Sequence, residues 1–428
     1  MEKIIILGAG LAGMAAAEQL IEQGKKNHAK FDITILEQNK EVGGLASSFL
    51  MNGKYIPKYY HHVFRHDKTT QKYLKKFNLL DKVAWKKIKM GICHKNKIYN
   101  FTDPVSLLKF DYLSLYGRLR YGLFGFYVFF MMNPNKISDN MNAKAWLDKY
   151  AGREVTDKIF YHLYARNKFN IPLERISARQ FAFRLKAREA MGRFGYPVTG
   201  LQSFIDAFER YLKKNKVNII KNSKINKINV KSKKVIVKNK EMDYDYLIST
   251  IPLPVFIRLS SGLPERFVQK VSKISYCPCV CVAFGTDRFL TNHYWINLIN
   301  ETTHTLFQHS NLFDGYGRSN KINWILRYGG SEADLDLSDS EIRKQYLQIL
   351  KKLFPKVNII WTRVFKEKYA EPVYDKDYSS NMPSIKAGIS GLYFAGTGVS
   401  YPKIRNMNSS LETGIEAAEE ILKDVRKL

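Results

Sequence analysis

Three glycines and one glutamate near the start of the chain have the spacing of a dinucleotide-binding turn. Gly8, Gly10 and Gly13 form a GxGxxG pattern, and Glu37 follows at the end of the next apolar run. In such a site the first glycine makes the tight turn, the second lets the backbone approach the pyrophosphate, and the third allows close packing of helix and strand. The carboxylate can accept hydrogen bonds from the adenosine ribose, which argues against a 2′-phosphate. The pattern therefore predicts binding of NAD or FAD.

The segments around these glycines have the character that such a turn requires. Residues 3–7 are an apolar run typical of a buried parallel strand, residues 14–20 favour a helix, and residues 31–36 resemble a second strand. A helix that begins at the turn offers free N–H groups and the positive end of its dipole to phosphates. We therefore include Leu11 and Ala12, inside the turn, among the predicted cofactor-binding residues.

Residues 41–47 favour FAD over NAD. Their sequence, Glu-Val-Gly-Gly-Leu-Ala-Ser, resembles the ExxxxxGGxxxS continuation found in the FAD-dependent amine-oxidase superfamily. In that family the paired glycines bring the chain close to the diphosphate and the ribityl arm of the flavin. The resemblance implies that FAD is the cofactor and that it is contacted by Gly43, Gly44, Leu45 and Ala46.

Two adjacent histidines, His61 and His62, are candidates for contact with a reacting group. They lie in the stretch Tyr-Tyr-His-His-Val-Phe, between aromatic side chains. This stretch resembles the histidine-containing loop of UDP-galactopyranose mutases and related bacterial oxidoreductases, in which the loop crosses the flavin face. Two partly buried histidines with satisfied hydrogen bonds would produce the same pattern. We predict that these histidines touch the flavin or the substrate, and we assign no catalytic base.

A second glycine turn, near the C-terminus, supplies further candidates. Residues 391–398 read as a strand that runs into a glycine turn, and a helix follows at 411–422. In amine-oxidase-type enzymes the matching strand ends in Ala-Gly-Asp, and the helix N-terminus stabilises negative charge on the reduced flavin. Here Thr397 stands in place of the acid, so its hydroxyl or backbone N–H groups would make that contact. The resemblance implies cofactor binding by Gly396, Thr397, Arg405, Met407 and Asn408, and a catalytic position beside the flavin for Tyr401 and Arg405.

Three central segments extend the resemblance. Residues 192–201 resemble the GYPxGG-like turn that returns the chain to the cofactor domain, with Thr199 in place of the first glycine of the final pair. Residues 217–240 alternate as strands do, and in this family such a meander supplies backbone groups to the adenine, here near Ile225. Residues 244–252 resemble the D-x-x-I-x-T-x-P return strand, which adds Thr250 to the predicted cofactor site.

The chain carries a formal net charge of +30, spread along its whole length of 428 residues, which excludes a disordered basic tail. No recognition-helix, RRM or zinc-finger pattern is present, so we expect no nucleic-acid partner. An anionic membrane surface, a phosphorylated substrate and lysine used for solubility each explain the charge. The apolar run at 121–132 is too short to span a bilayer. It is either a buried helix or an interfacial segment in peripheral contact with a membrane.

Cys277, Cys279 and Cys281 are spaced so that all three thiols lie on one face of a strand. No partner Cys or His stands at a ligand spacing, so we interpret them as core residues and predict no metal site. Four cysteines do not make a disulfide framework in a chain of this length. We expect no signal peptide ahead of the first strand. We expect a cytoplasmic protein, or one held peripherally at the cytosolic face of a membrane.

The motifs occur in family order from one end of the chain to the other. The chain therefore resembles the FAD-dependent amine-oxidase superfamily, and within it the protoporphyrinogen-oxidase-like and UDP-galactopyranose-mutase-like bacterial oxidoreductases. The resemblance implies an α/β fold in which a Rossmann-type FAD-binding domain carries an inserted α+β substrate lobe, as in the glutathione-reductase and amine-oxidase architecture. The expected FAD-binding parts are 1–66, 195–255 and 376–428, the helical substrate lobe is 67–194, and the substrate-lobe sheet is 256–375.

The resemblance leaves two functions open. The first is an FAD-dependent oxidoreductase that acts on a bulky, sugar- or lipid-linked substrate, which the apolar run and the basic surface favour. The second is a flavin-dependent isomerase of a nucleotide sugar, like UDP-galactopyranose mutase, which the histidine loop and the arginines favour. No second GxGxxG occurs, so electrons from a net oxidation would leave to oxygen, a quinone or a partner protein. The oligomeric state stays open.

Overall fold

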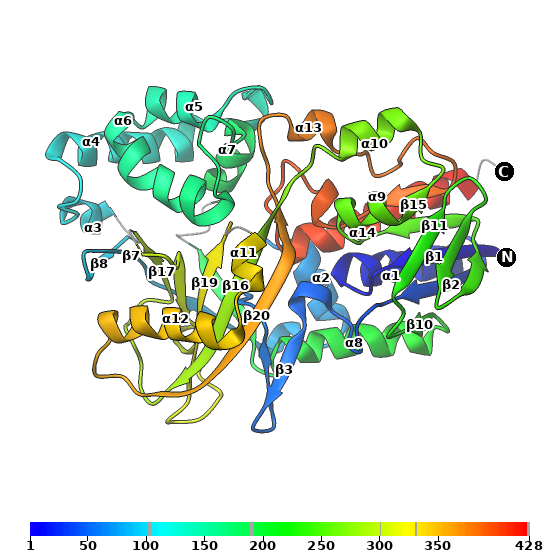
Figure 1. Cartoon of the computed structure of the whole chain (residues 1–428), viewed down its shortest axis with the longest axis horizontal. Helices are drawn as coiled ribbons and strands as arrows, with labels where there is room; N and C mark the ends of the chain where they lie inside the picture. The colour runs from blue at the N-terminus through cyan, green and yellow to red at the C-terminus, as the bar shows by residue number, and fades with distance from the viewer. Residues whose placement is uncertain (102–103, 188–191, 300, 330–331, 426–428) are drawn as a thin grey trace.

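A parallel sheet of five strands holds both ends of the chain, at the right of Figure 1. Its central strand β1 (Glu2–Leu7) pairs with β2 (Phe31–Leu36) on one side and β14 (Tyr246–Ser249) on the other. The edge strands are β10 (Asn218–Ile220) and β21 (Leu392–Phe394). Parallel strands covered on both faces need near-continuous apolar runs, which explains the sequence of β1 and β2. The computed structural model describes residues 1–101, 104–187, 192–299, 301–329 and 332–425.

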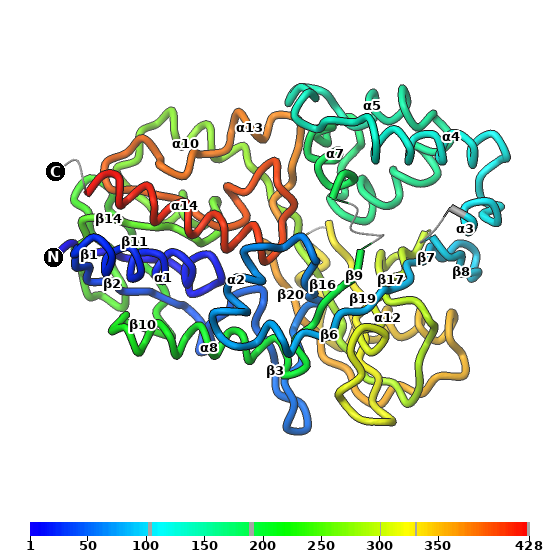
Figure 2. The backbone as a smooth tube through the Cα atoms, turned by 180° about the vertical axis from the view of Figure 1, so that it is seen from behind, coloured from blue at the N-terminus to red at the C-terminus, as the bar shows by residue number. Residues whose placement is uncertain are grey.

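The first and last helices of the chain pack against each other beside this sheet. They are α1 (Leu11–Lys26) and α14 (Met407–Val425), which run side by side in Figure 2. A Cβ on Gly414 would lie 2.2 Å from the carbonyl oxygen of Ala12, so only glycine permits this approach. The helices α2 (Lys68–Lys76) and α8 (Leu201–Lys214) complete the layer. Segments about four hundred residues apart therefore form one side of the domain.

A seven-stranded sheet forms the second part of the molecule, in the order β20-β16-β19-β18-β17-β7-β8. Two of its strands, β7 and β8, come from the segment 67–194, which the sequence predicts to be the substrate and helical lobe. They join the sheet because β7 pairs in parallel with β17. The helix α12 (Asp339–Leu353) covers one face of the sheet. The strand bounds are β20 Ile359–Pro372, β16 Tyr276–Thr286, β19 Lys321–Tyr328, β18 Thr305–Gln308, β17 Trp295–Leu298, β7 Met90–His94 and β8 Lys97–Asn100.

A group of helices lies above the seven-stranded sheet at the upper left of Figure 1, and we call it the helical lobe. It has its own apolar core, in which Trp146, Phe160 and Phe181 are almost fully buried. The apolar run at 121–132 lies in its outermost elements, α4 and η3. The members of the lobe are α3 Pro104–Leu108, α4 Leu115–Phe126, the π-helix η3 Tyr127–Met131, α5 Ala143–Tyr150, α6 Arg153–Val155, the π-helix η5 Thr156–Phe169 and α7 Ala178–Lys186.

Smaller elements connect these parts. The predicted Asn-Gly hairpin is present as β3 (Ser48–Met51) and β4 (Lys54–Pro57), with positive φ at Asn52 and Gly53. Among the described residues, no helix combines the length and apolar character needed to cross a membrane. The remaining strands and longer helices are β5 Val63–Phe64, β6 Val83–Lys87, β9 Arg193–Pro197, β11 Ile225–Asn229, β12 Lys234–Val237, β13 Lys240–Asp243, β15 Ser260–Ser261, α9 Leu253–Leu259, α10 Glu265–Val271, α11 Glu332–Asp336 and α13 Tyr378–Asn381.

Candidate functional site

A cavity of about 800 Å³ lies where the parallel sheet, the seven-stranded sheet and the helical lobe meet. Most of the residues predicted from the sequence line it, although they come from four separate stretches of the chain. Those that line it are Gly8, Gly10, Leu11, Ala12, Glu37, Gly43, Gly44, Leu45, Ala46, His61, His62, Ile225, Thr250, Gly396, Thr397, Arg405 and Met407. The fold thus brings the predicted cofactor residues and the predicted catalytic residues to one space.

The glycine turn between β1 and α1 has the geometry that its spacing predicts. Gly8 has a φ of +100°, which disfavours any residue with a side chain, and a Cβ on Gly13 would lie 2.1 Å from the carbonyl oxygen of Gly8. Gly10 is different, because a Cβ there would have no protein atom within 4 Å. Its φ of −73° also allows other residues. The missing side chain at Gly10 therefore leaves space on the cavity side of the turn.

The start of α1 offers hydrogen-bond donors to this space. Gly10 caps the helix without a side-chain hydrogen bond, and the first turn of α1 contains no acidic residue. The first N–H groups of a helix lack intrahelical acceptors, and they carry the positive end of the helix dipole. A diphosphate fits this combination of donors, charge and open space. Gly43, with φ +109°, donates its N–H to the Ala9 carbonyl and so holds the glycine pair beside the turn.

Glu37 lies at the end of β2, 5% exposed, and its carboxylate is held from two sides. One oxygen accepts a hydrogen bond from the backbone N–H of Ala9 at 2.8 Å, and the other accepts from the backbone and side chain of Asn39 at 2.9 and 3.0 Å. These bonds fix the carboxylate at the cavity wall. Its predicted bond to a ribose remains a prediction.

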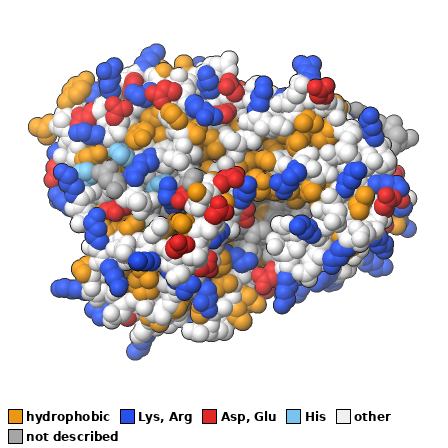
Figure 3. Space-filling model, viewed as in Figure 1, with side chains coloured by type: hydrophobic (Ala, Val, Ile, Leu, Met, Phe, Trp, Pro, Cys, Tyr) orange, Lys and Arg blue, Asp and Glu red, His pale blue; other side chains and the backbone are white. Residues whose placement is uncertain are grey.

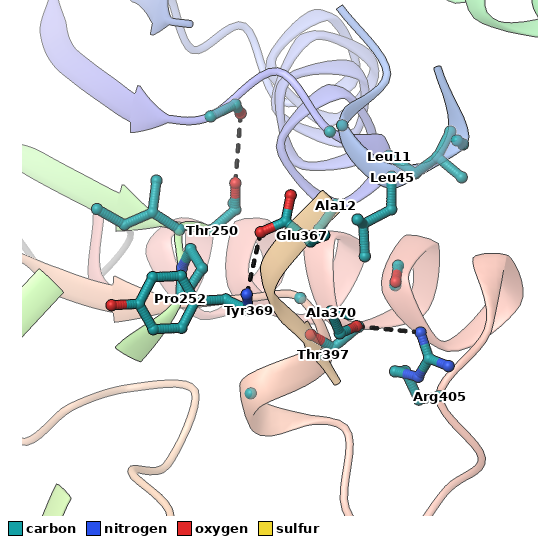
Figure 4. A pocket seen from close by; sticks show the side chains of 18 of the residues that line it. Leu11, Ala12, Leu45, Thr250, Pro252, Glu367, Tyr369, Ala370, Thr397 and Arg405 are labelled. Carbon is teal, nitrogen blue, oxygen red and sulfur yellow. Dashed lines mark hydrogen bonds between the residues drawn. The ribbon is translucent and has the colours of Figure 1, made fainter. Parts of the chain in front are cut away.

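Two threonines support the turns on either side of the cavity. The hydroxyl of Thr250 lies 2.7 Å from the Leu7 carbonyl oxygen and 3.3 Å from that of Gly8, and so ties the end of β14 to the glycine turn. The contact with Gly8 is the one drawn in Figure 4. Thr397 lies beside Ala370 in the same view, at the end of β21. The N–H of Gly396 donates to Thr413 on α14 at 2.9 Å, which holds the second glycine turn against that helix.

The two histidines keep some accessible surface because they face the cavity, while protein encloses the loop that carries them. The Nδ1–H of His61 donates to the Tyr59 carbonyl at 2.9 Å, and Nδ1 of His62 lies 3.0 Å from the hydroxyl of Tyr294. Burial lowers the pKa of His61 to about 4 and that of His62 to about 3. Both rings are therefore neutral at physiological pH, and the Nε2 atom of His61 is an acceptor in this tautomer.

A cluster of charged side chains lies at the end of the cavity that the helical lobe borders. Arg405 donates to Glu371 at 2.9 Å and to the Ala370 carbonyl at 3.2 Å, the second contact being drawn in Figure 4. Lys168, from η5, lies 3.2 Å from the other oxygen of Glu371. The carboxylate is 1% exposed, so the two cations share one buried anion. We call Lys168, Glu371 and Arg405 the charge cluster.

Burial and charge shift the pKa values of the cluster in different directions. Burial, together with the nearby guanidinium of Arg184, lowers the pKa of Lys168 to about 8, although Glu371 opposes the shift. Burial alone would raise the pKa of Glu371, but Arg405 and Lys168 outweigh it and hold the pKa below its ordinary value. The cluster thus keeps one carboxylate ionised between two cations, and Lys168 alone can lose its proton near neutral pH.

The wall of the cavity is strongly cationic. Among the described lining residues, seven are Lys or Arg and two are carboxylates, so the cavity suits an anionic ligand. The basic ones are Lys58, Lys168, Arg184, Lys224, Arg258, Lys366 and Arg405, and the acidic ones are Glu37 and Glu367.

Three predicted site residues lie elsewhere. Gly13 is at the packing contact between α1 and β1, which is the structural part of its predicted role. Asn408 accepts from the Thr70 N–H at 3.0 Å and donates to Glu412 at 2.7 Å, so its side chain joins two helices rather than lining the cavity. Tyr401, 8% exposed, directs its hydroxyl away from the cavity wall. That hydroxyl donates to Asp139 at 2.7 Å and lies 2.8 Å from the hydroxyl of Ser177. The structure therefore does not support a catalytic position for Tyr401.

Sequence reasoning missed the partners of Arg405. Lys168 reads as one more basic residue of a helical segment, and nothing in its neighbourhood marks it as buried. Glu371 carried a usable signal, because apolar and aromatic residues flank it on both sides in Tyr-Ala-Glu-Pro-Val-Tyr. A buried carboxylate requires a cationic partner, and that requirement would have pointed to the cluster.

The three cysteines of β16 are buried, as predicted, at 2% or less of their surface. Burial raises the pKa of the Cys277 thiol to about 12. Cys279 is one of the residues that line the cavity. Among the residues that the structure describes, no group of three or more His, Cys, Asp or Glu is arranged to hold a metal ion.

Comparisons with known proteins agree with this geometry. In sequence, the chain is 22% identical to 15-cis-phytoene desaturase, chloroplastic/chromoplastic, of Arabidopsis thaliana, over 100% of this chain and 81% of that protein. In structure, it is similar to reduced UDP-galactopyranose mutase, with a TM-score of 0.78, 16% identity, and coverage of 99% and 96% of the two chains.

A second solved structure has the same fold. It is a protein of Exiguobacterium sp. 255-15 described as a protoporphyrinogen oxidase, with a TM-score of 0.77, 15% identity, and coverage of 98% and 99%. At such low identity, structural similarity establishes the fold and not the substrate. The family model for flavin containing amine oxidoreductases matches residues 11–422, almost the whole chain. The chain therefore belongs to the flavin containing amine oxidoreductase family.

Proposed function

We propose that this protein is an FAD-dependent oxidoreductase that acts on a bulky, sugar- or lipid-linked substrate with an anionic group. One observation carries the proposal: a single cavity extends from the glycine turn at Gly10 to the buried charge cluster. Its first end has donors, positive potential and open space suited to a dinucleotide. Its other end holds the cations Lys168 and Arg405. With the flavin's diphosphate at the glycine turn, these cations would stay available to a second ligand.

The residues at the turn fit FAD. The space beside Gly10 and the free N–H groups of α1 suit the pyrophosphate, and the fixed carboxylate of Glu37 suits the ribose hydroxyls. Gly43 and Gly44, both with positive φ, bring the backbone to the cavity without side chains. When bound, FAD supplies the capacity to accept two electrons from a substrate bond.

The charge cluster would bind and orient the substrate. Arg405 keeps its charge at all physiological pH values, because Glu371 raises its pKa even though burial opposes this. Lys168 adds a second cation with a pKa of about 8, so the cluster holds an anionic group most firmly below that pH. The neutral His61 presents Nε2 as an acceptor to the same cavity. This arrangement fixes one end of a substrate while leaving its reacting bond free to face the flavin.

The proposal is tested first by the cofactor and then by reduction. FAD released from the purified protein is identified by chromatography against FMN. The holoprotein is then mixed anaerobically with lipid-linked and sugar-linked candidate substrates, and loss of the oxidised-flavin absorbance is followed. Reduction by a substrate with an anionic group, and not by its neutral analogue, is the expected result. Reduction at equal rates by both would contradict the anionic assignment.

A matched pair of variants tests the role of the charge cluster. Lys168→Met removes a buried cation of the cluster, and we expect KM to rise at least about tenfold, which is the loss of about 1.4 kcal/mol of binding. Lys213→Met removes a cation of α8 that is 56% exposed and lies outside the cavity wall, and it should leave KM unchanged. A change confined to kcat, or an equal change in both variants, would contradict substrate binding by Lys168.

The alternative is a flavin-dependent isomerase of a nucleotide sugar. The strongly cationic cavity wall favours it, because a nucleotide sugar carries a diphosphate. The two functions differ in electron balance: an isomerase needs reduced flavin and consumes no oxidant. Turnover of UDP-galactopyranose only after prior reduction of the flavin, with no net oxidation, would replace the oxidoreductase proposal by this one.

A further inference from the structure

The outer side of α4 and η3 exposes a row of large apolar side chains. Leu115, Leu119, Leu123, Phe126 and Phe130 follow one another at intervals of three or four residues, so they share one side of the helix. Their exposed fractions are 80, 62, 55, 56 and 71%. We call these five side chains the outer stripe. Hydrophobic atoms gather at the upper left edge of Figure 3, over the position of α4 in Figure 1.

Neighbouring residues widen this surface. Tyr116 and Met131 are each 69% exposed, and Val105 and Leu108 of α3 are exposed by 63 and 68%. Among the described residues, 17 large hydrophobic side chains are exposed, and nine of them lie within positions 105–131. Exposed apolar residues scattered singly require no explanation, but a contiguous patch of this kind marks an interaction surface.

The inner side of the same segment is also apolar, and it is already buried. Phe124, Val128 and Met132 are 2 to 3% exposed, and the ring of Phe124 lies 5.5 Å from that of Trp146. Lys186 of α7 donates to the carbonyls of Val128 and Phe129, which fixes η3 to the lobe. A helix that is apolar on all sides is normally buried on all sides. The outer stripe is therefore an exposed apolar surface whose opposite side is anchored in the core of the lobe.

The charge around the stripe is positive. Positions 112–138 contain no Asp or Glu, but they contain Arg118, Arg120 and Lys136. Arg118 and Arg120 donate hydrogen bonds to backbone carbonyls, which carry no net charge, so these bonds do not neutralise the two guanidinium groups. Two described carboxylates beside the segment are already engaged, since Asp111 pairs with Lys97 and Glu154 with Lys158.

We propose that the outer stripe docks on the surface of a lipid bilayer that contains anionic lipids, with α4 lying in the plane of the interface. The 12 residues of α4 span about 18 Å at 1.5 Å per residue, well short of the roughly 30 Å hydrocarbon core. An amphipathic surface with leucine and phenylalanine at its centre and arginine at its sides fits the boundary between headgroups and acyl chains. The proposal does not depend on the reaction that the cavity supports.

The charges favour a bilayer over a second copy of this chain. A symmetric dimer through the stripe would bring two copies of the same cationic rim together, since a two-fold interface pairs a patch with itself. Anionic headgroups would instead neutralise the arginines at the depth to which the stripe inserts. Self-association is therefore an outcome that the experiment must detect.

Vesicle flotation with the flavin-loaded protein tests the proposal. The probes are vesicles of phosphatidylcholine alone and of phosphatidylcholine with phosphatidylglycerol, each at low and at high salt. The test variant is Leu119→Ser/Leu123→Ser/Phe126→Ser, and the control is Leu50→Ser/Val198→Ser/Ile360→Ser, which removes three exposed apolar side chains elsewhere, at 60, 46 and 52% exposure. A thermal unfolding scan establishes that each variant is folded.

We expect the wild type and the control to float with the anionic vesicles, more weakly at high salt because the charges are screened. The stripe variant should lose at least about tenfold in vesicle affinity at an unchanged unfolding temperature, tenfold being a free-energy change of about 1.4 kcal/mol. Absence of wild-type binding to anionic vesicles at low salt would overturn the proposal. So would undiminished binding by the stripe variant. A wild-type dimer that the stripe variant makes monomeric would assign the surface to self-association instead.

Discussion

Substitution of Gly10 by alanine separates the fold from cofactor binding. The backbone at Gly10 has φ −73° and ψ 176°, which alanine adopts without strain, and the new methyl group meets no protein atom within 4 Å. In the protein without flavin, Gly10→Ala should therefore be neutral or stabilising by about 0.4–1 kcal/mol, because alanine restricts the unfolded chain. The methyl group would occupy the space in which the pyrophosphate must approach the turn. Overpacking of this kind costs about 1–3 kcal/mol, so the Kd for FAD should rise about 5- to 150-fold.

The assay combines fluorescence titration of the deflavinated protein with FAD and urea unfolding of the same protein. Gly122→Ala is the matched control, because it also meets no atom within 4 Å but lies on α4, outside the cavity wall. It should leave the Kd unchanged. Gly13→Ala should instead destabilise the fold itself, since its Cβ would lie 2.1 Å from the Gly8 carbonyl oxygen. Wild-type FAD affinity in Gly10→Ala would refute the placement of the diphosphate at this turn.

Three further predictions concern the stability of the site. Glu371→Gln leaves two buried cations without their anion and should lower the free energy of unfolding by about 3–5 kcal/mol in urea titrations, with part of the loss recovered when Lys168→Met is added. Because the pKa of His61 is about 4 and that of His62 about 3 when folded, against 6.5 in the unfolded chain, the unfolded state binds more protons below pH 6.5. The free energy of unfolding should therefore fall as the pH is lowered from 6.5 towards 4, by about 3 kcal/mol for His61 alone, and His62→Phe should flatten the curve. Gly414→Ala should lower the thermal stability by about 1–3 kcal/mol, because its Cβ would lie 2.2 Å from a carbonyl oxygen of α1; an unchanged unfolding temperature would mean that the two helices can move apart.

The cofactor half of the site could be predicted from the sequence because its geometry is local. The positive φ of Gly8 and the tight contact at Gly13 follow from a turn between one strand and the next helix, within a few residues. Glu37 follows at the end of the neighbouring strand, whose register with β1 brings Leu7 opposite Leu36. Local steric requirements leave a readable trace in residue type and spacing.

The substrate half could not be predicted in the same way. Lys168 comes from the π-helix η5, Glu371 from the end of the 14-residue strand β20, and Arg405 from the loop before α14. Their meeting depends on tertiary packing, which no spacing in the sequence reports. Tyr401 shows the converse error, because resemblance placed it near the second glycine turn but could not give the direction of its side chain. Its hydroxyl meets Asp139 instead, from the helical lobe.

The apolar run at 121–132 gave two interpretations. The structure shows burial for one side of α4 and η3, and interfacial binding by the other side is our proposal. Phe124 and Val128 belong to the core, whereas Leu123 and Phe126 face outward. A run that is apolar on both sides has no polar face from which its orientation could be read, so composition alone could not separate burial from interfacial binding. The basic residues Arg118, Arg120 and Lys136, with no Asp or Glu at positions 112–138, are what favour an anionic bilayer for the exposed side.

The outer stripe and the cavity are joined by one helix. Within α7, Lys186 holds the carbonyls of η3, and Arg184, two residues earlier, lines the cavity. An anionic, water-soluble substrate would explain the cationic cavity but not the stripe. A purely apolar substrate would explain the stripe but not the cationic cavity. A lipid-linked substrate with a charged headgroup would account for both, because the bilayer to which we propose that the stripe binds would be its source. If that is so, Lys168→Met should weaken turnover of such a substrate in detergent and in vesicles alike. The stripe variant should weaken it only in vesicles.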